Sequence, residues 1–217
     1  MLIKVTPLDQ DFSFELELKN GKGSFWHCDN GVLKMGSEDC AETTLYYSYT
    51  NMPTTGTLTI GDKTMNVTGK SWFDKQGGKF NIVDPSTHWE WFSLRFDDNE
   101  EMMLFAYPQS KYYDGTYIPK EGKEQRLNNY KLTPLTIEVI DEIKFATSWE
   151  LHIPGMKEEQ YTLVPVGEKV RTSFMLELLC YIYNSRKEVV GLCIAEILPG
   201  VYSGDKISAL SKESLDI

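Results

Sequence analysis

The sequence predicts an all-β protein whose antiparallel strands form a barrel or two packed β units. Three observations support this prediction. Many segments alternate apolar and polar residues, turn-forming residues recur at intervals of about ten residues, and no segment keeps a helical apolar period for long. Only residues 207–215 are compatible with a short terminal helix. Many short strands at such spacings are typical of β-sandwiches and β-barrels.

The first part of the chain contains two clear strand signals. Residues 12–18 carry apolar side chains at every second position and run into an Asn-Gly turn. Residues 56–69 are expected to form a hairpin around the Gly-Asp turn at 61–62. A two-residue turn there pairs Thr59 with Thr64 and apolar residues with apolar residues.

Three more hairpins are expected later in the chain, because alternating or apolar segments flank a turn signal in residues 89–107, 149–166 and 173–198. The glycine- and proline-bearing loop at 77–86 is the candidate junction between a partial first β unit, residues 1–84, and a second β-barrel unit, residues 85–217. The first unit supplies about five strands, too few to close a barrel. We therefore expect either homo-oligomerisation through its N-terminal strands or an open sheet packed on the second unit.

The composition is that of a globular protein, with 41% apolar and 25% charged residues among 217. The formal net charge of -10 would repel a phosphate backbone, and no long cluster of Lys and Arg residues offsets it, so nucleic acid is not an expected partner. No apolar run approaches the length of a membrane helix, and residues 1–10 lack the pattern of a signal peptide. We expect no membrane span and a cytoplasmic location.

The cysteines and histidines do not suggest a metal centre. None of the four cysteines forms a C-x-x-C pair, so free, buried thiols are expected. Cys180 and Cys193 lie on the two strands of one hairpin, which leaves a cross-strand disulfide as the alternative. The three histidines come from distant segments, and the chain carries no phosphate-binding or zinc-binding motif. No metal and no cofactor is expected.

The segment from Gly69 to Gly78 resembles the glycine, tryptophan, aspartate, glycine signature of the lipocalin-like family that holds the AttH-type proteins and the carotenoid hydratases (hydroxyneurosporene synthases). The tyrosine-rich segment 46–52, the W-x-W segment 89–98 and the closing segment 191–200 resemble further family motifs in the same order. The resemblance implies a lipocalin-like fold. Family members usually carry a whole β domain ahead of the tyrosine-rich strand, so the first domain is expected to be incomplete here.

The resemblance also implies a chemistry, because relatives of known activity add water to an isolated carbon-carbon double bond of a hydrophobic substrate. That reaction needs an acid that stays protonated in an apolar pocket and an aromatic face that stabilises a cation. Asp74 is an acid with an aromatic neighbour, since Trp72 would point to the same side of a regular strand. Lys75 and Gly77 stand where many relatives have a histidine and an aromatic residue. The alternative is structural: Asp74 caps a turn and Trp72 fills core.

Two further sets of residues are ligand-binding candidates. Glu177 and Glu196 each interrupt an apolar strand and would face one another across a hairpin, although exposure on one strand face is the alternative. Aromatic pairs that share a strand face are the other set, with core packing as the alternative: Tyr47 and Tyr49, Trp89 and Trp91.

Two functions remain open from the sequence. One is a hydratase that adds water to an isoprenoid or polyphenol-like substrate, with Asp74 as the acid. The other is a non-catalytic protein that binds or carries a small hydrophobic ligand. A raised pKa of Asp74 beside an enclosed cavity favours the first, and an Asp74 held by backbone amides with no cavity beside it favours the second.

Overall fold

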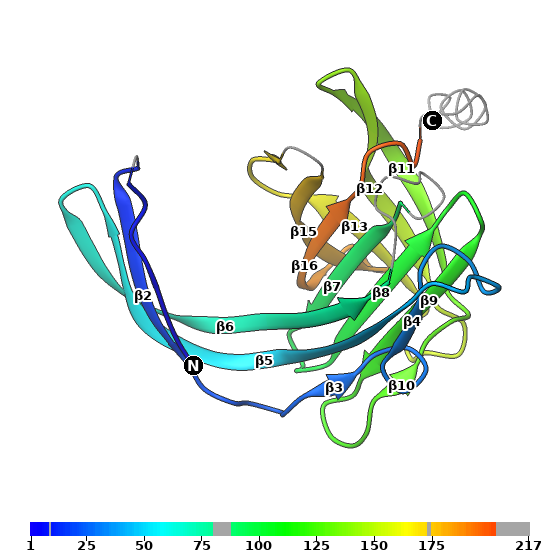
Figure 1. Cartoon of the computed structure of the whole chain (residues 1–217), viewed down its shortest axis with the longest axis horizontal. Helices are drawn as coiled ribbons and strands as arrows, with labels where there is room; N and C mark the ends of the chain where they lie inside the picture. The colour runs from blue at the N-terminus through cyan, green and yellow to red at the C-terminus, as the bar shows by residue number, and fades with distance from the viewer. Residues whose placement is uncertain (9, 80–87, 173–174, 203–217) are drawn as a thin grey trace. The chain divides into compact units, whose positions relative to one another are not determined.

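A computed structural model describes residues 1–8, 10–79, 88–172 and 175–202, and 63% of these residues lie in β-strands (Figure 1). The described residues contain no helix, and so none that is long and apolar enough to cross a membrane. The predicted all-β, antiparallel fold class is confirmed. The short helix expected at 207–215 lies outside the described residues, as does Phe174 on the expected strand before Leu176.

The described residues divide into two compact units according to their internal contacts. The first contains Met1–Trp26 and Tyr46–Gln76, and the second contains His27–Leu45 and the chain from Gly77 onward. Each unit is described by itself below. The boundary expected between residues 84 and 85 falls in the segment 80–87, which lies outside the described residues.

The first unit is an antiparallel sheet in which β5 (Thr43–Ile60) is the central strand. It pairs with β2 (Phe12–Leu18), with the short β3 (Phe25–Trp26) and with β6 (Lys63–Gly78), while β1 (Leu2–Val5) pairs with β2. The hydroxyl groups of Thr59 and Thr64 lie 3.0 Å apart. The hairpin predicted around residues 61–62 is therefore confirmed. Self-association through the N-terminal strands stays a prediction.

Residues 27–45 belong to the second unit for identifiable reasons. The short strand β4 (Val32–Lys34) pairs with the first residues of β5, and the backbone N–H of Cys28 donates a hydrogen bond of 2.9 Å to Thr116 Oγ1. Met35 is fully buried, and its sulfur accepts a hydrogen bond of 3.5 Å from the Tyr107 hydroxyl. Buried contacts at Cys28 and Met35 thus fix this segment to the second unit.

The second unit is a curled antiparallel sheet, and its described strands follow the order β10-β9-β8-β7-β16-β15-β13-β12-β11, with β14 paired to β15 (Figure 1). Their bounds are Glu90–Phe96 (β7), Glu101–Tyr107 (β8), Tyr112–Ile118 (β9), Gln125–Arg126 (β10), Lys131–Ile140 (β11), Ile143–His152 (β12), Gln160–Pro165 (β13), Val170–Arg171 (β14), Leu176–Asn184 (β15) and Val189–Ile197 (β16). The pairs β7 with β8, β12 with β13 and β15 with β16 confirm the three later hairpins.

Strands β9 and β11 did not follow from the sequence. β9 mixes aromatic, acidic and glycine residues without clear alternation, and β11 contains Pro134, which cannot donate a ladder hydrogen bond. The structure accommodates Pro134 because β11 ends the strand order and its pairing with β12 shifts register between Pro134 and Thr136. An edge position and a bulge are where a strand tolerates proline.

The inner face of this sheet is filled by side chains. Phe92 and Trp149 are fully buried, and their rings meet edge to face with centroids 5.0 Å apart. Apolar residues from seven strands contribute to the same core, including Leu94, Leu104, Leu132, Phe145, Leu163, Leu178 and Ala195. The interior of the second unit is therefore a packed core.

The cysteines are free thiols, as expected, and Cys28, Cys180 and Cys193 are buried while Cys40 is partly buried. Cys180 and Cys193 are directly opposite one another on β15 and β16. Burial raises the pKa of Cys180 to about 12, so this thiol is not a reactive thiolate near neutral pH.

One carboxyl group lies inside the packed core of the second unit. Glu90 is only 1% exposed, and its Oε1 accepts hydrogen bonds from the Tyr202 hydroxyl at 2.7 Å and from Trp149 Nε1 at 3.2 Å. Burial raises the pKa of Glu90 to about 7, although both hydrogen bonds lower it. The carboxyl group is therefore largely protonated in the folded protein under mildly acidic conditions.

We expect Gly191→Ala to destabilise the protein by about 1 to 3 kcal/mol, because a Cβ at this position would lie 2.2 Å from the backbone oxygen of Arg95 on the neighbouring strand. Gly69→Ala is the matched control. No atom lies within 4 Å of a Cβ at Gly69, so the same substitution there should be neutral or stabilising by about 0.4 to 1 kcal/mol. Urea unfolding of both variants measures the difference, and equal stabilities would contradict the close approach of β16 and β7.

The Glu90 carboxyl group should make the stability of the protein depend on pH. Its folded-state pKa is raised, so its contribution is fully present below pH 4.5 and is lost as the pH rises through about 7. We expect the wild type to lose about 3 kcal/mol relative to Glu90→Gln between pH 4.5 and pH 8.5. Glutamine keeps an oxygen that accepts both hydrogen bonds. Urea unfolding across this pH range checks the prediction, with exposed Glu121→Gln as the control, and parallel profiles for wild type and Glu90→Gln would contradict it.

Candidate functional site

Asp74 lies at the centre of a polar cluster in the first unit. Its Oδ1 atom accepts hydrogen bonds of 2.7 Å from the Tyr46 hydroxyl and 2.7 Å from Trp72 Nε1, and a third from the Ser48 hydroxyl. Among the described residues, none donates a hydrogen bond to its Oδ2 atom. One oxygen of the carboxyl group is therefore fixed by side chains, and the other has no donor among these residues.

The two strands of the long hairpin bring this cluster together. Trp72 and Asp74 alternate along β6 and share one face, while Tyr46 and Ser48 share one face of β5. The register set by the two-residue turn would place Asp74 opposite Tyr49. Instead Phe73 packs against Tyr49 with ring centroids 6.3 Å apart, and Asp74 reaches Ser48. The pairing has shifted by one residue, which turns Asp74 to the polar face of β5.

The surroundings of Asp74 change its protonation. The residue as a whole is exposed, but enough protein surrounds the carboxyl group for burial to raise its pKa. The hydrogen bonds from Ser48, Trp72 and Tyr46 lower the pKa and offset part of this effect. The alternative of a turn cap is not seen: all donors to Asp74 among the described residues are side chains, and residues 77–78 belong to β6.

Thr50 continues the polar face of β5. It is fully buried, and its Oγ1 atom makes no hydrogen bond with any of the described residues. Because it follows Ser48 by two positions, it lies on the same strand face, within about 7 Å along the strand. A buried hydroxyl group without a partner among the described residues leaves hydrogen-bonding capacity for a water molecule or a ligand on this strand face.

The predicted candidates Tyr47 and Tyr49 lie on the other face of β5. Their rings contact each other with centroids 6.2 Å apart, and Tyr47 also packs on Trp26 at 5.0 Å. Phe73 extends this row from β6. Trp26 is 45% exposed, so the row is an aromatic surface of the first unit rather than its core. The structure brings these tyrosines together but separates them from the Asp74 carboxyl group by the thickness of the sheet.

The remaining candidates lie together in the second unit. Glu196 on β16 is directly opposite Glu177 on one side and Trp91 on the other. The Nε1 atom of Trp89 donates a hydrogen bond of 2.9 Å to the Glu196 carboxylate. Trp89 and Trp91 are buried, whereas both glutamates are half-buried. The expected approach of Glu177 and Glu196 across their hairpin is confirmed. The structure adds the hydrogen bond from the Trp89 indole N–H to Glu196.

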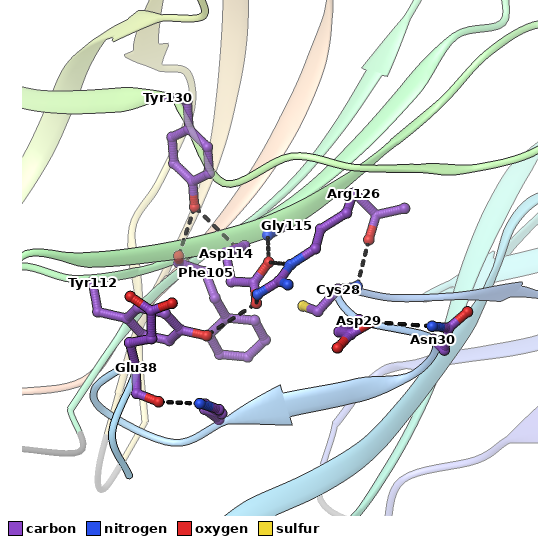
Figure 2. A network of polar contacts seen from close by, with 12 residues as sticks. Cys28, Asp29, Asn30, Glu38, Phe105, Tyr112, Asp114, Gly115, Arg126 and Tyr130 are labelled. Carbon is purple, nitrogen blue, oxygen red and sulfur yellow. Dashed lines mark hydrogen bonds and ion pairs between the residues drawn. The ribbon is translucent and has the colours of Figure 1, made fainter.

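A further acid, Asp114 on β9, is the centre of the network in Figure 2. Its carboxylate accepts hydrogen bonds from Arg126 Nε at 3.0 Å and Nη2 at 2.8 Å, from the Tyr112 hydroxyl at 3.0 Å and from the backbone N–H of Gly115 at 2.9 Å. Cys28 lies beside the ion pair of Asp114 and Arg126. Burial, together with the charge of Asp114, raises the pKa of the Cys28 thiol. Asp114 is thus an ion-paired acceptor with both oxygens occupied, and it attaches β10 to β9.

These environments separate the three acids by what each can do. Asp114 is ion-paired and has both oxygens occupied, and Glu90 is enclosed in the core. Asp74 combines a raised pKa, exposure and an oxygen without a donor among the described residues, which are the properties that a proton donor to a bound molecule requires. The described residues include no group of three or more His, Cys, Asp or Glu side chains placed to hold a metal ion.

The sequence did not identify Tyr46, Ser48 and Thr50, although Tyr47 and Tyr49 from the same strand were singled out. Alternation along β5 defines two faces. A hairpin without a register shift would place Asp74 on the face of Tyr47 and Tyr49, whereas in the structure it lies on the other face. A single sequence does not reveal a register shift inside a long hairpin. The available hint is that Tyr46, Ser48 and Thr50 place hydroxyl groups at alternate positions of one strand.

Comparisons with known proteins agree with this fold. The crystal structure of an AttH-type protein from Nitrosomonas europaea matches with a TM-score of 0.76 and 14% identity over 91% of this chain and 64% of that chain. Kievitone hydratase from Nectria haematococca matches with a TM-score of 0.71 and 14% identity over the same shares, 91% and 64%. The chain therefore spans less than two thirds of the length of either protein.

No curated protein sequence matches the chain. At 14% identity, the two crystal structures establish the fold alone. The family model for AttH-like proteins, however, matches residues 3–177, which is most of the sequence. The chain therefore belongs to the AttH-like family.

Proposed function

We propose that this protein is a hydratase that adds water to a carbon-carbon double bond of a hydrophobic substrate, with Asp74 as the proton donor. One observation carries the proposal. Tyr46, Ser48 and Trp72 hold the Oδ1 atom of a carboxyl group whose pKa is raised by burial, while its Oδ2 atom is left for a proton. A positioned, protonated acid is the group that this reaction needs first.

The atoms of the reaction balance with this chain's own residues. The Asp74 carboxyl group transfers its proton to one alkene carbon, and the double-bond electrons form the new carbon-hydrogen bond. A cation remains on the other carbon, and the oxygen of a water molecule bonds to it. The excess proton of that water returns to the Asp74 carboxylate, which restores the acid. The net change is the addition of one water molecule to the substrate.

Neighbouring side chains have definite tasks in this scheme. The indole of Trp72, fixed by its hydrogen bond to Asp74, offers a π face that stabilises the developing cation without reacting with it. The hydrogen bonds from Tyr46 and Ser48 stabilise the carboxylate that forms when the proton leaves. Thr50, whose hydroxyl has no partner among the described residues, is placed on the same face to orient the attacking water.

The substrate class is a hydrophobic molecule, isoprenoid or polyphenol-like, with an isolated double bond. The name of the structural relative kievitone hydratase is consistent with water addition, but its 14% identity carries no residue-level role to this chain. The alternative is a non-catalytic protein that binds a hydrophobic ligand. The half-exposed aromatic row of Trp26, Tyr47, Tyr49 and Phe73 supplies a surface that suits either function.

We expect Asp74→Asn to abolish hydration while leaving the fold intact. An asparagine oxygen accepts the same three hydrogen bonds, but the amide does not donate a proton as a carboxylic acid does. The measurement is the gain of one water by members of an isoprenoid and polyphenol alkene panel, followed by mass spectrometry in ¹⁸O-labelled water. Asp62→Asn in the exposed β5–β6 turn is the matched control and should retain turnover.

Other outcomes of this experiment decide against catalysis. A destabilised Asp74→Asn with unchanged turnover would make Asp74 structural. A wild-type protein that turns over no alkene, yet retains a hydrophobic ligand through purification, would favour the binding function.

Trp72→Phe should raise the pKa of Asp74 further. The Trp72 hydrogen bond lowers this pKa, and phenylalanine keeps an aromatic ring but has no N–H to donate. A ¹³C NMR titration of the Asp74 carboxyl carbon measures the shift directly. The loss of hydration with rising pH should move to higher pH by the same amount, because the protonated acid is the active form. An unchanged or lowered pKa would contradict the role of the indole N–H.

A further inference from the structure

A cavity of about 660 Å³ lies in the second unit where the β7–β8, β12–β13 and β15–β16 turns come together beside β9. It borders the packed core described above, because Tyr161 belongs to that core and Phe96 and Tyr117 pack against it, and it contains none of the acids assigned so far. Its volume falls within the range of small-molecule sites, about 300 to 1,000 Å³. Its lining combines aromatic walls with acidic turns.

The walls are aromatic rings fixed by packing. Phe96 and Tyr161 meet with centroids 5.1 Å apart and planes inclined at 50°, and Tyr117 on β9 also lines the cavity. Met156 and Val190 add apolar surface. Such walls accept a flat, apolar molecular body, and an aromatic face also attracts a cation placed over it.

The rim carries an excess of negative charge. Asp97, Asp98, Glu100 and Glu158 line the cavity, against Lys157 and Arg186. Arg186 is engaged by Glu188, with its Nε and Nη2 atoms 3.0 and 2.8 Å from one carboxylate oxygen. The negative potential therefore has little compensation from cations at the cavity.

The tyrosines respond to this potential. Burial first, and then the charges of Glu158, Glu100 and Asp98, raise the pKa of Tyr161 to about 12. Burial, together with a hydrogen bond to Glu100 and its charge, also raises the pKa of Tyr117. Both phenols stay protonated, and an incoming cation would experience the same field with a favourable sign.

Tyr161 supplies an independent indication of a ligand. Its side chain is only 8% exposed, and its hydroxyl group makes no hydrogen bond with any other described residue. Tyr161 lines the cavity, and its hydroxyl group can donate and accept a hydrogen bond with a molecule that occupies that space.

We infer that this cavity binds an organic ammonium ion whose charged group is carried on an aromatic body. The ammonium group would lie among Asp98, Glu100 and Glu158 and donate a hydrogen bond to the Tyr161 hydroxyl, with the aromatic body against Phe96, Tyr117 and Met156. A carboxylate-bearing analogue would be repelled by the rim. A neutral analogue would contact the same aromatic walls, but the acidic residues would not increase its affinity.

Three indoles of one shape test this assignment on the full-length chain. Tryptamine carries the ammonium group, tryptophol replaces it with a neutral hydroxyl, and indole-3-acetate carries a carboxylate. In isothermal titration calorimetry at low salt we expect tryptamine to bind at least about tenfold more tightly than tryptophol, with no binding of indole-3-acetate. Raising the ionic strength from about 0.01 M to about 1 M should weaken tryptamine binding and leave tryptophol unchanged.

Variants locate the site. Glu158→Gln and Asp98→Asn keep the hydrogen-bonding shape of each side chain and remove one charge, so each should weaken tryptamine binding by about two- to fivefold. Tyr161→Phe should weaken it while preserving the ring contact with Phe96. Glu168→Gln removes the same charge from an exposed position outside the cavity and should have no effect. Thermal melts confirm that all four variants remain folded.

Two results would overturn the inference. Equal affinities for tryptamine and tryptophol would mean that the cavity does not recognise charge. Tryptamine binding that is absent, or that survives all three cavity substitutions unchanged, would mean that the cavity is not the site.

Discussion

The backbone pairing of β5 is the constraint on which the first sheet depends. Within the first unit, β2, β3 and β6 all hydrogen-bond to this strand, so its position fixes theirs. Because side chains alternate along a strand, β5 also presents two surfaces of different chemistry. Tyr46, Ser48 and Thr50 form a polar face, and Tyr47 and Tyr49 form an aromatic one. The orientation of β6 relative to these faces decides whether its acid meets hydroxyl groups or rings.

Three buried or partly buried carboxyl groups illustrate how differently a β protein accommodates an acid. Asp114 forms an ion pair with the guanidinium of Arg126, and both of its oxygens accept hydrogen bonds. Glu90 has only neutral donors, and the apolar core favours its protonated form. Asp74 lies between these extremes, because its donors are numerous but bind a single oxygen. The residue type is nearly constant across the three sites, and the environment determines which donors each carboxyl group meets.

The part of this structure that follows from the sequence is the part governed by local rules. Alternation and turn residues define the hairpin of Thr59 and Thr64 and the later hairpins, because the strand period and the turn geometry act over a few residues. β11 is missed because Pro134 argues against a strand unless the edge position and the bulge are known. The partners of Asp74 are missed for a related reason: a one-residue shift between long strands is a non-local event. The Trp72 and Asp74 contact is predicted because both residues lie on one strand.

The filled interior of the second unit separates stability from recognition. Phe92, Trp149 and their neighbours hold the strands together from inside, whereas the charged rim of the cavity lies in the turns. Turns tolerate substitution and changes of length far better than packed strands do. Selection acting on such a scaffold can alter the shape or charge of the cavity by a few turn substitutions without disturbing the core. The same framework can thus diversify its ligands among descendants while its folding free energy stays nearly constant.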